Sequence, residues 1–189
     1  MLPTYDSLDS VAIEAQFHVR HVPSESGERG VRPAQMIYYV EVASAVYGLT
    51  VNLDLDGIGK TSLVKVEDAL ASEPGERTRR IKASLMALAA LFVGEGFGAK
   101  LSRFLPIKQV KSMVAALSSP IAFTVSPPQL STYIEDTASR ASAFKEMLDK
   151  LGISSEISLI AYADKVPQGV DQASSPEDLF KRLIEKVVK

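Results

Sequence analysis

The sequence predicts an α+β protein in which helices cover one face of an antiparallel sheet. Three observations predict this class. Residues 11–20 alternate apolar and polar side chains, residues 35–55 form a long extended stretch, and apolar residues recur at helical spacing over 75–94 and 131–152. With strands expected at 107–117 and 156–163 and a helix at 174–188, the elements run strand, long strand, helix, strand, helix, strand, helix. A sheet backed by helices satisfies that order.

The two N-terminal strands are predicted from alternation. In residues 11–20 the apolar positions are Ile13, Ala15, Phe17 and Val19, and the positions between them are polar, which is typical of a half-buried strand. In residues 35–55 the apolar positions also alternate, but they change parity near 43–45. Parity cannot change without a bulge or bend, so we expect one long, kinked strand that pairs with the first. Residues 21–34 between them are turn-rich and predict a mobile loop.

The three helices carry capping signals as well as apolar stripes. The inward positions of the first are Ile81, Leu85, Leu88 and Phe92, followed by Gly94 as a candidate C-cap. Those of the second are Ile134, Ala138, Ala141, Phe144 and Leu148, with Gly152 closing it. The third is expected to begin at Ser175 as N-cap, with Pro176 at its first position and acids in its first turn.

The element order resembles the latter part of a ferredoxin-like unit whose first strand and helix are missing. The length of 189 residues suits a single domain over 1–189. The chain has no cysteine, no apolar run of about 18 residues and no secretory signal pattern, which fits a cytoplasmic protein. No spacing typical of metal ligands or of a cofactor site occurs, so we expect neither.

Positive charge is concentrated in one segment of a chain whose net charge is −2. Eight basic residues lie from Arg77 to Lys111 with one acid, Glu95, so this segment carries +7 and the remainder −9. Such asymmetry indicates a local anion-binding face. The alternative is a solvated helix N-terminus followed by a polar strand edge.

The glycine-rich stretch "GEGFGAKLSRFLP", residues 94–106, lies inside this segment. Glycines allow backbone N–H groups to approach phosphate oxygens, and Lys100 and Arg103 add charge for the same anion. Gly96 and Gly98 are therefore candidate contacts to a nucleic-acid backbone. Phe97 could stack on a base or fill the core, and the whole stretch could instead be a helix cap and turn.

Two nucleotide-loop motifs are excluded by their context. "DGIGKTS" at 56–62 places Asp54 where a phosphate loop needs glycine, and "GEGFG" follows a helix where the dinucleotide motif follows a strand. Catalytic patterns are also weak, because the chain has two histidines and no G-x-S-x-G elbow. His18 shares a strand face with Arg20, so it could cleave RNA by acid–base chemistry or lie beside an RNA phosphate or a partner subunit.

Three collinear stretches resemble a known family. "IEAQFHVRHV", "AQMIYYVEVASAVYGLTVNLDLD" and "RIKASLMALAALFVGEGFGAKLSRFLP" are similar, in that order and spacing, to the DevR-like CRISPR-associated backbone subunit of archaeal type I-A Cascade complexes. The resemblance implies an RRM-like fold without catalysis or cofactor. It also implies that copies of the chain polymerise along single-stranded CRISPR RNA, grip its backbone and contact other Cascade subunits, away from any membrane.

The resemblance assigns RNA contacts to Gly96, Gly98, Lys100 and Arg103 in the glycine-rich loop, and to His18 and Arg20 on the strand. It further implies that the chain is the C-terminal part of the family's polypeptide and lacks the first strand, the first helix and an inserted lobe. An RNA endonuclease that uses His18, and a regulatory nucleic-acid-binding protein, remain the alternatives.

Overall fold

The computed structural model describes residues 4–7, 13–20, 36–43, 45–61, 64–93 and 109–188, with side chains from residue 45 onwards. The chain divides into two compact units, Pro3–Leu49 and, in the main, Thr50–Lys189, and each is described here by itself. We predicted a single domain over 1–189. The division into two compact units does not decide that prediction. The predicted loop at 21–34 lies outside the described residues.

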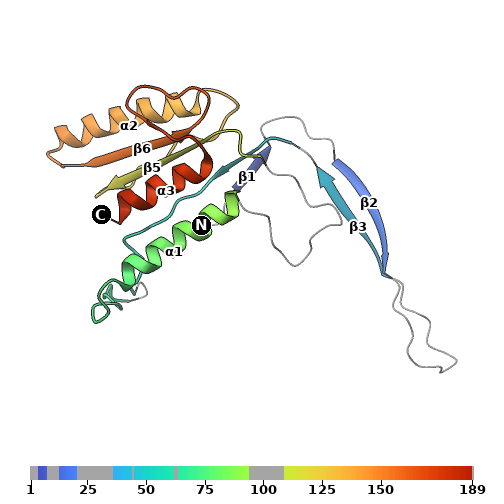
Figure 1. Cartoon of the computed structure of the whole chain (residues 1–189), viewed down its shortest axis with the longest axis horizontal. Coiled ribbons are helices and arrows are strands. Elements are labelled where there is room, and N and C mark those ends of the chain that lie inside the picture. The colour runs from blue at the N-terminus through green and yellow to red at the C-terminus, as the bar shows by residue number, and fades with distance from the viewer. Residues whose placement is uncertain are drawn as a thin grey trace. The chain divides into compact units, whose positions relative to one another are not determined.

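The N-terminal unit is described as strands (Figure 1). They are β1 (Thr4–Ser7), β2 (Ile13–Arg20), β3 (Met36–Ala43) and β4 (Tyr47–Thr50). β2 and β3 pair antiparallel, and β1 pairs with β4 in a separate two-stranded sheet. β2 confirms the strand predicted at 11–20. β1 was not predicted, because four residues are too few to establish an alternation.

The single long strand predicted over 35–55 is wrong. Two strands, β3 and β4, occupy its first part and have different partners, and residues 51–54 are not in a strand. The interruption falls between Ala43 and Tyr47, where the apolar positions change parity. Two strands with separate partners can each bury their own apolar side, which one continuous strand in one register cannot do.

The C-terminal unit contains helices and a small sheet. Its elements are α1 (Glu76–Val93), β5 (Met113–Ser119), α2 (Tyr133–Lys150), β6 (Glu156–Tyr162), β7 (Asp171–Gln172) and α3 (Pro176–Val187). The three predicted helices and the strand at 156–163 are confirmed within one or two residues. The strand predicted at 107–117 is displaced, because β5 begins at Met113 and extends to Ser119.

The sheet of this unit is mixed, not antiparallel as predicted. Its strand order is β5-β6-β7, in which β5 and β6 are antiparallel and β6 and β7 are parallel. β7 has two residues and therefore leaves no periodic pattern in the sequence. Its place is fixed by pairing, with Ile160 opposite Asp171 and Ala161 opposite Gln172.

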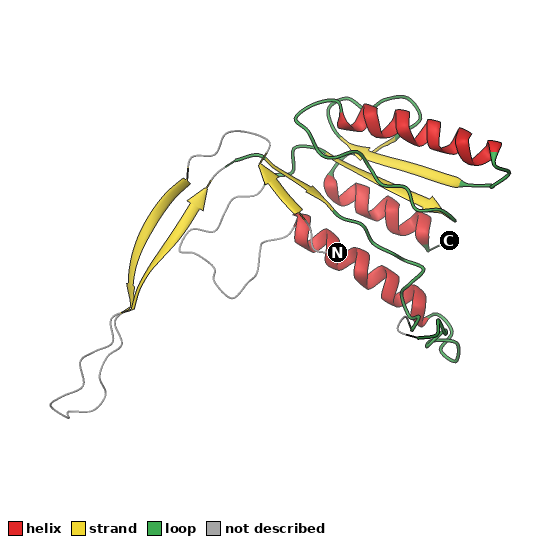
Figure 2. Cartoon of the chain, turned by 180° about the vertical axis from the view of Figure 1, so that it is seen from behind, coloured by secondary structure: helices red, strands yellow, loops and turns green. Residues whose placement is uncertain are grey.

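Helices lie on both faces of this sheet, whereas one face was predicted (Figure 2). Ala161 of β6 packs with Tyr133 and Ile134 at the start of α2. Its neighbour Ile160 packs with Leu179 of α3. Because successive residues of a strand point to opposite faces, these two contacts put α2 and α3 on opposite sides of β6.

α1 packs against α3, where the rings of Phe92 and Phe180 lie 6.0 Å apart between centroids. The architecture of this unit is thus a mixed three-stranded sheet with three helices, an α+β arrangement consistent with a ferredoxin-like fold. Within the described ranges, no helix combines the length and apolar character that crossing a membrane requires.

Thr137 of α2 fastens the connection between β5 and α2 to the helix. The residue is fully buried. Its hydroxyl donates to the carbonyl oxygen of Tyr133 at 2.6 Å and accepts from the backbone N–H of Ser126 at 3.0 Å. The buried backbone N–H of Ser126 is thereby satisfied by a side chain.

We expect Thr137→Val to lower the free energy of unfolding by about 1–3 kcal/mol, because valine keeps the volume and leaves the Ser126 N–H buried without an acceptor. Thr137→Ser is the matched control, because it keeps the hydroxyl and loses one methyl group. Urea unfolding measures the free energy, and amide hydrogen exchange at Ser126 reports the bond itself. A Ser126 amide that stays protected in the valine variant would show that Thr137 is not its acceptor.

Candidate nucleic-acid interface

The structure places two of the six predicted RNA contacts. His18 and Arg20 lie on β2, two residues apart and therefore on one face of the strand. Gly96, Gly98, Lys100 and Arg103 lie in the segment 94–108, outside the described residues. The structure thus brings His18 and Arg20 onto one face, and the glycine-rich loop stays a prediction.

The pairing of β2 with β3 determines what else shares that face. His18 is opposite Tyr38, Arg20 is opposite Met36, and Gln16 is opposite Val40. Directly opposed residues of an antiparallel pair lie on the same face. The polar row of β2 therefore shares a face with the row of β3 that alternation marks as apolar.

This face combines two kinds of group that single-stranded RNA uses. Arginine and histidine bind phosphates, and an aromatic residue such as Tyr38 offers a stacking surface for a base. Sequence reasoning did not include Tyr38, because alternation within β3 marks it as apolar. The missing signal was the register between the strands, which puts Tyr38 opposite His18.

The start of the basic segment is neutralised locally. Arg77 Nη2 lies 2.8 Å from an oxygen of Asp68. Arg79 Nη2 and Arg80 Nε lie 2.7 Å and 2.9 Å from the two oxygens of Glu76. Both acids precede the window from Arg77 to Lys111, so counting charge along the chain overstated the local field. For these three arginines the solvated helix N-terminus is the better interpretation.

Both carboxyl groups have lowered pKa values. The hydrogen bond from Arg80 is the largest cause of the lowered pKa of Glu76. For Asp68 the backbone N–H of Leu70 is the largest cause of the lowered pKa, and Arg77 adds to it. Both acids therefore stay ionised beside their arginines, and the pairs are occupied by intramolecular contacts.

The stretch "DGIGKTS" is a structural turn. Asp54 accepts a hydrogen bond from the backbone N–H of Gly57 at 3.1 Å. Gly59 has φ +82°, and a Cβ there would lie 2.3 Å from the side chain of Leu70. Thr61 donates through its hydroxyl to the carbonyl oxygen of Lys65 at 2.8 Å. The glycines and the threonine of this stretch are thus explained by the reversal of the chain. This agrees with the sequence analysis, which rejected a phosphate-binding loop here.

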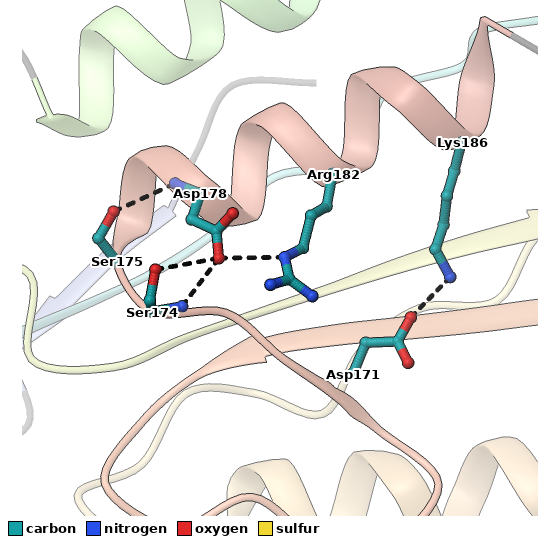
Figure 3. Close-up of polar contacts among 6 residues, drawn as sticks. All are labelled: Asp171, Ser174, Ser175, Asp178, Arg182 and Lys186. Carbon is teal, nitrogen blue, oxygen red and sulfur yellow. Dashed lines mark hydrogen bonds and ion pairs between the residues drawn. The ribbon is translucent and has the colours of Figure 1, made fainter.

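A polar network fixes the start of α3 (Figure 3). The Ser175 hydroxyl accepts from the backbone N–H of Asp178 at 3.2 Å, as the predicted N-cap should. The Asp178 carboxylate accepts from the backbone N–H of Ser174 at 2.9 Å and from Arg182 Nε at 3.0 Å. These bonds satisfy donors at the helix start, so the acidic residue has a capping role.

A second contact ties α3 to the sheet (Figure 3). Lys186 Nζ lies 2.8 Å from an Asp171 oxygen on β7. It also donates to the Ser158 hydroxyl on β6. Asp178 therefore stabilises the start of α3, and the pair of Asp171 and Lys186 holds α3 against β7. Over the part of the chain that the structure describes, no three His, Cys, Asp or Glu residues come together as metal ligands.

Asp178 should give folding stability a dependence on pH. Its contacts with Ser174 and then Arg182 lower its pKa from 3.8 to about 2. A lowered folded-state pKa means that the stabilisation is present above pH 3.8 and is lost as pH falls towards about 2. We therefore expect Asp178→Asn to be less stable than the original chain at neutral pH.

The difference should shrink across that acidic interval in urea unfolding curves. Asp149→Asn is the control, since the Asp149 carboxylate has no hydrogen bond or ion pair with the residues that the structure describes. A difference between Asp178→Asn and the original chain that is the same at neutral pH and near pH 2 would contradict this account.

The chain is thus a small α+β protein in which one face of the β2–β3 pair carries polar and aromatic residues. A family model described as "CRISPR-associated negative auto-regulator DevR/Csa2" matches residues 1–138. The chain belongs to this DevR/Csa2 family, which confirms the resemblance seen in the sequence.

Relatives from archaea agree with the family model. The chain is 33% identical over 178 residues to a "CRISPR-associated aCascade subunit Cas7/Csa2 2" of Saccharolobus solfataricus, a match covering 92% of this chain and 52% of the relative. It is 32% identical over 151 residues to "CRISPR-associated protein Cas7/Csa2 1" of the same organism, covering 79% and 46%. It is 29% identical to "CRISPR-associated protein Cas7/Cst2/DevR" of Methanocaldococcus jannaschii, covering 99% and 57%.

The chain spans about half the length of the curated relatives it matches. The prediction that the chain is the C-terminal part of the family's polypeptide stays a prediction. The predicted lack of a first strand and first helix stays a prediction, and the described residues before 11 include the strand β1.

Proposed function

We propose that this chain is a non-catalytic, RNA-binding structural subunit of a CRISPR Cascade complex. The observation that carries the proposal is the match across 92% of the chain to a relative named as an aCascade subunit. In the proposal, copies of the chain assemble along a single-stranded CRISPR RNA and contact other subunits of the complex. RNA is held through its backbone, without a chemical step.

Two groups of residues would hold the RNA. Gly96 and Gly98 would let the backbone of the loop approach phosphate oxygens, and Lys100 and Arg103 would supply charge. His18 and Arg20 would contact the RNA from β2. The register supports the second group, because it puts Tyr38 on the face that carries His18 and Arg20 and so adds a stacking surface for a base.

Lys100→Ala combined with Arg103→Ala should weaken binding to single-stranded RNA of any sequence. Each lost phosphate contact removes about 0.7 from the slope of log K against log salt, so two contacts lower its magnitude by about 1.4. Fluorescence anisotropy at a series of salt concentrations measures both quantities. Lys145→Ala with Lys181→Ala is the matched control, since it removes the same charge from exposed positions on α2 and α3. Unchanged affinity and slope in the first pair would remove the loop from the site.

The same assay tests the alternative that the chain is a regulatory nucleic-acid-binding protein. The family description includes the words "negative auto-regulator". A structural Cascade subunit should bind single-stranded RNA more tightly than duplex DNA of equal length. A preference for duplex DNA would favour the regulator.

The non-catalytic part of the proposal has its own test. Labelled RNA incubated with the chain in the absence of metal should remain intact, because His18 has a binding role. Denaturing gel electrophoresis detects any product. Products that appear with the original chain and disappear with His18→Ala would establish the endonuclease alternative.

A further inference from the structure

The two faces of the β2–β3 pair differ in character. The first face is apolar on both strands except for Glu41. Its apolar positions are Ile13, Ala15, Phe17, Val19, Ile37, Tyr39 and Ala43. The second face carries the polar row of β2, which consists of Glu14, Gln16, His18 and Arg20. A strand pair with one apolar side buries that side, so the face with the polar row is the one available to a ligand.

Charge is graded along the polar row. Glu14 stands near one end of β2 and Arg20 at the other, with Gln16 and His18 between them. A strand advances about 3.4 Å per residue, so the two charged positions lie about 20 Å apart. At physiological salt charges are screened beyond about 8 Å, so the acid and the base do not neutralise each other. The Arg20 end therefore attracts a phosphate, and the Glu14 end repels one.

The row of β3 on the same face offers a different surface. Its positions are Met36, Tyr38, Val40 and Val42, and none of them is charged. Directly paired residues of two antiparallel strands have Cβ positions about 4.5–5.5 Å apart, so this uncharged row runs close beside the polar row. It can therefore receive the flat face of a base, and Tyr38 gives it an aromatic ring for stacking.

The strand order determines on which side of the polar row the bases can lie. β2 and β3 form a two-stranded sheet, so within the described residues β3 is the one strand beside β2 in that sheet. A nucleotide carries its base to one side of its sugar–phosphate backbone. When the backbone lies along β2, the bases therefore meet an apolar surface on the side of β3.

We propose that this face orients single-stranded RNA and limits how far the RNA extends along the strand pair. The sugar–phosphate backbone follows β2 at the Arg20 end, the bases lie over β3 at Tyr38, and Glu14 repels the phosphates beyond. The RNA thus leaves the face before it reaches the Ile13 end of β2. This orientation rests on the proposed RNA binding. It adds a path for the RNA and a role for Glu14, which is not one of the proposed RNA contacts.

Glu14→Gln tests the limit, because it removes the repelling charge and keeps the size of the side chain. Its affinity for a uridine oligomer should rise about threefold or more at low salt, where the repulsion is least screened. Glu41→Gln is the matched control, because it removes the same charge from the opposite face of the same strand pair and should leave the affinity unchanged. Fluorescence anisotropy with the full chain measures both affinities.

Arg20→Gln and Tyr38→Leu test the path, with a uridine oligomer and an abasic ribose-phosphate oligomer of equal length as probes. Arg20→Gln should lower the affinity for both oligomers by the same factor, because both carry phosphates. Tyr38→Leu should lower the affinity for the uridine oligomer about fivefold or more, because a stacked base loses its aromatic partner. The same variant should bind the abasic oligomer as the original chain does, which also shows that it is folded.

Photo-crosslinking of a thiouridine oligomer shows directly where the bases lie. Mass spectrometry of the peptides should find adducts at Met36 or Tyr38 and none at Val42. Adducts as frequent at Val42 as at Tyr38 would overturn the proposed path, and equal affinities of Glu14→Gln and Glu41→Gln would overturn the limit.

The proposed function and the proposed orientation fail in different ways. A full chain that binds no single-stranded RNA would overturn the proposed function, and the orientation with it. RNA binding that depends on Lys100 and Arg103 but is unchanged in Arg20→Gln and Tyr38→Leu would overturn the orientation alone.

Discussion

The C-terminal unit depends on the burial of β6 from both sides. Ala161 is fully buried and Ile160 is 1% exposed, although they are neighbours whose side chains point to opposite faces of the sheet. α2 covers one face of the sheet and α3 covers the other. α1 packs against α3. Each fully buried aliphatic side chain contributes about 1.5–3 kcal/mol relative to exposure. One short strand therefore holds α2 and α3, and the caps and ion pairs refine the positions of these helices.

The sequence predicts the helices well because their signals are local. Ser175 and Pro176 mark the start of α3, and apolar spacing marks its buried stripe, so no distant contact is needed to find it. Strand limits depend on partners far along the chain. β5 begins at Met113 because its partner β6 ends at Tyr162, a pairing that alternation within 107–117 does not encode. The continuous apolar run in β6 did contain the signal for two covered faces, since strands buried on both sides lose their alternation.

The candidate sites show the same division between local and distant information. His18 and Arg20 could be placed on one strand face from spacing alone, whereas the nearness of Tyr38 required the register. The partners of Arg79 and Arg80 could have been found in the sequence, because Glu76 lies three and four residues before them.

The ion pairs at the start of α1 also bear on how quickly a polyanion could find this protein. Arg77, Arg79 and Arg80 share two carboxylates, Asp68 and Glu76, so together the five side chains leave one positive charge. At physiological salt, charges are screened beyond about 8 Å, and closely paired charges act on a distant ligand mainly as weak dipoles. Electrostatic steering, which can raise association rates by orders of magnitude, therefore gains little from this cluster. Long-range attraction of a polyanion to this protein would therefore depend on cations other than the three arginines of α1.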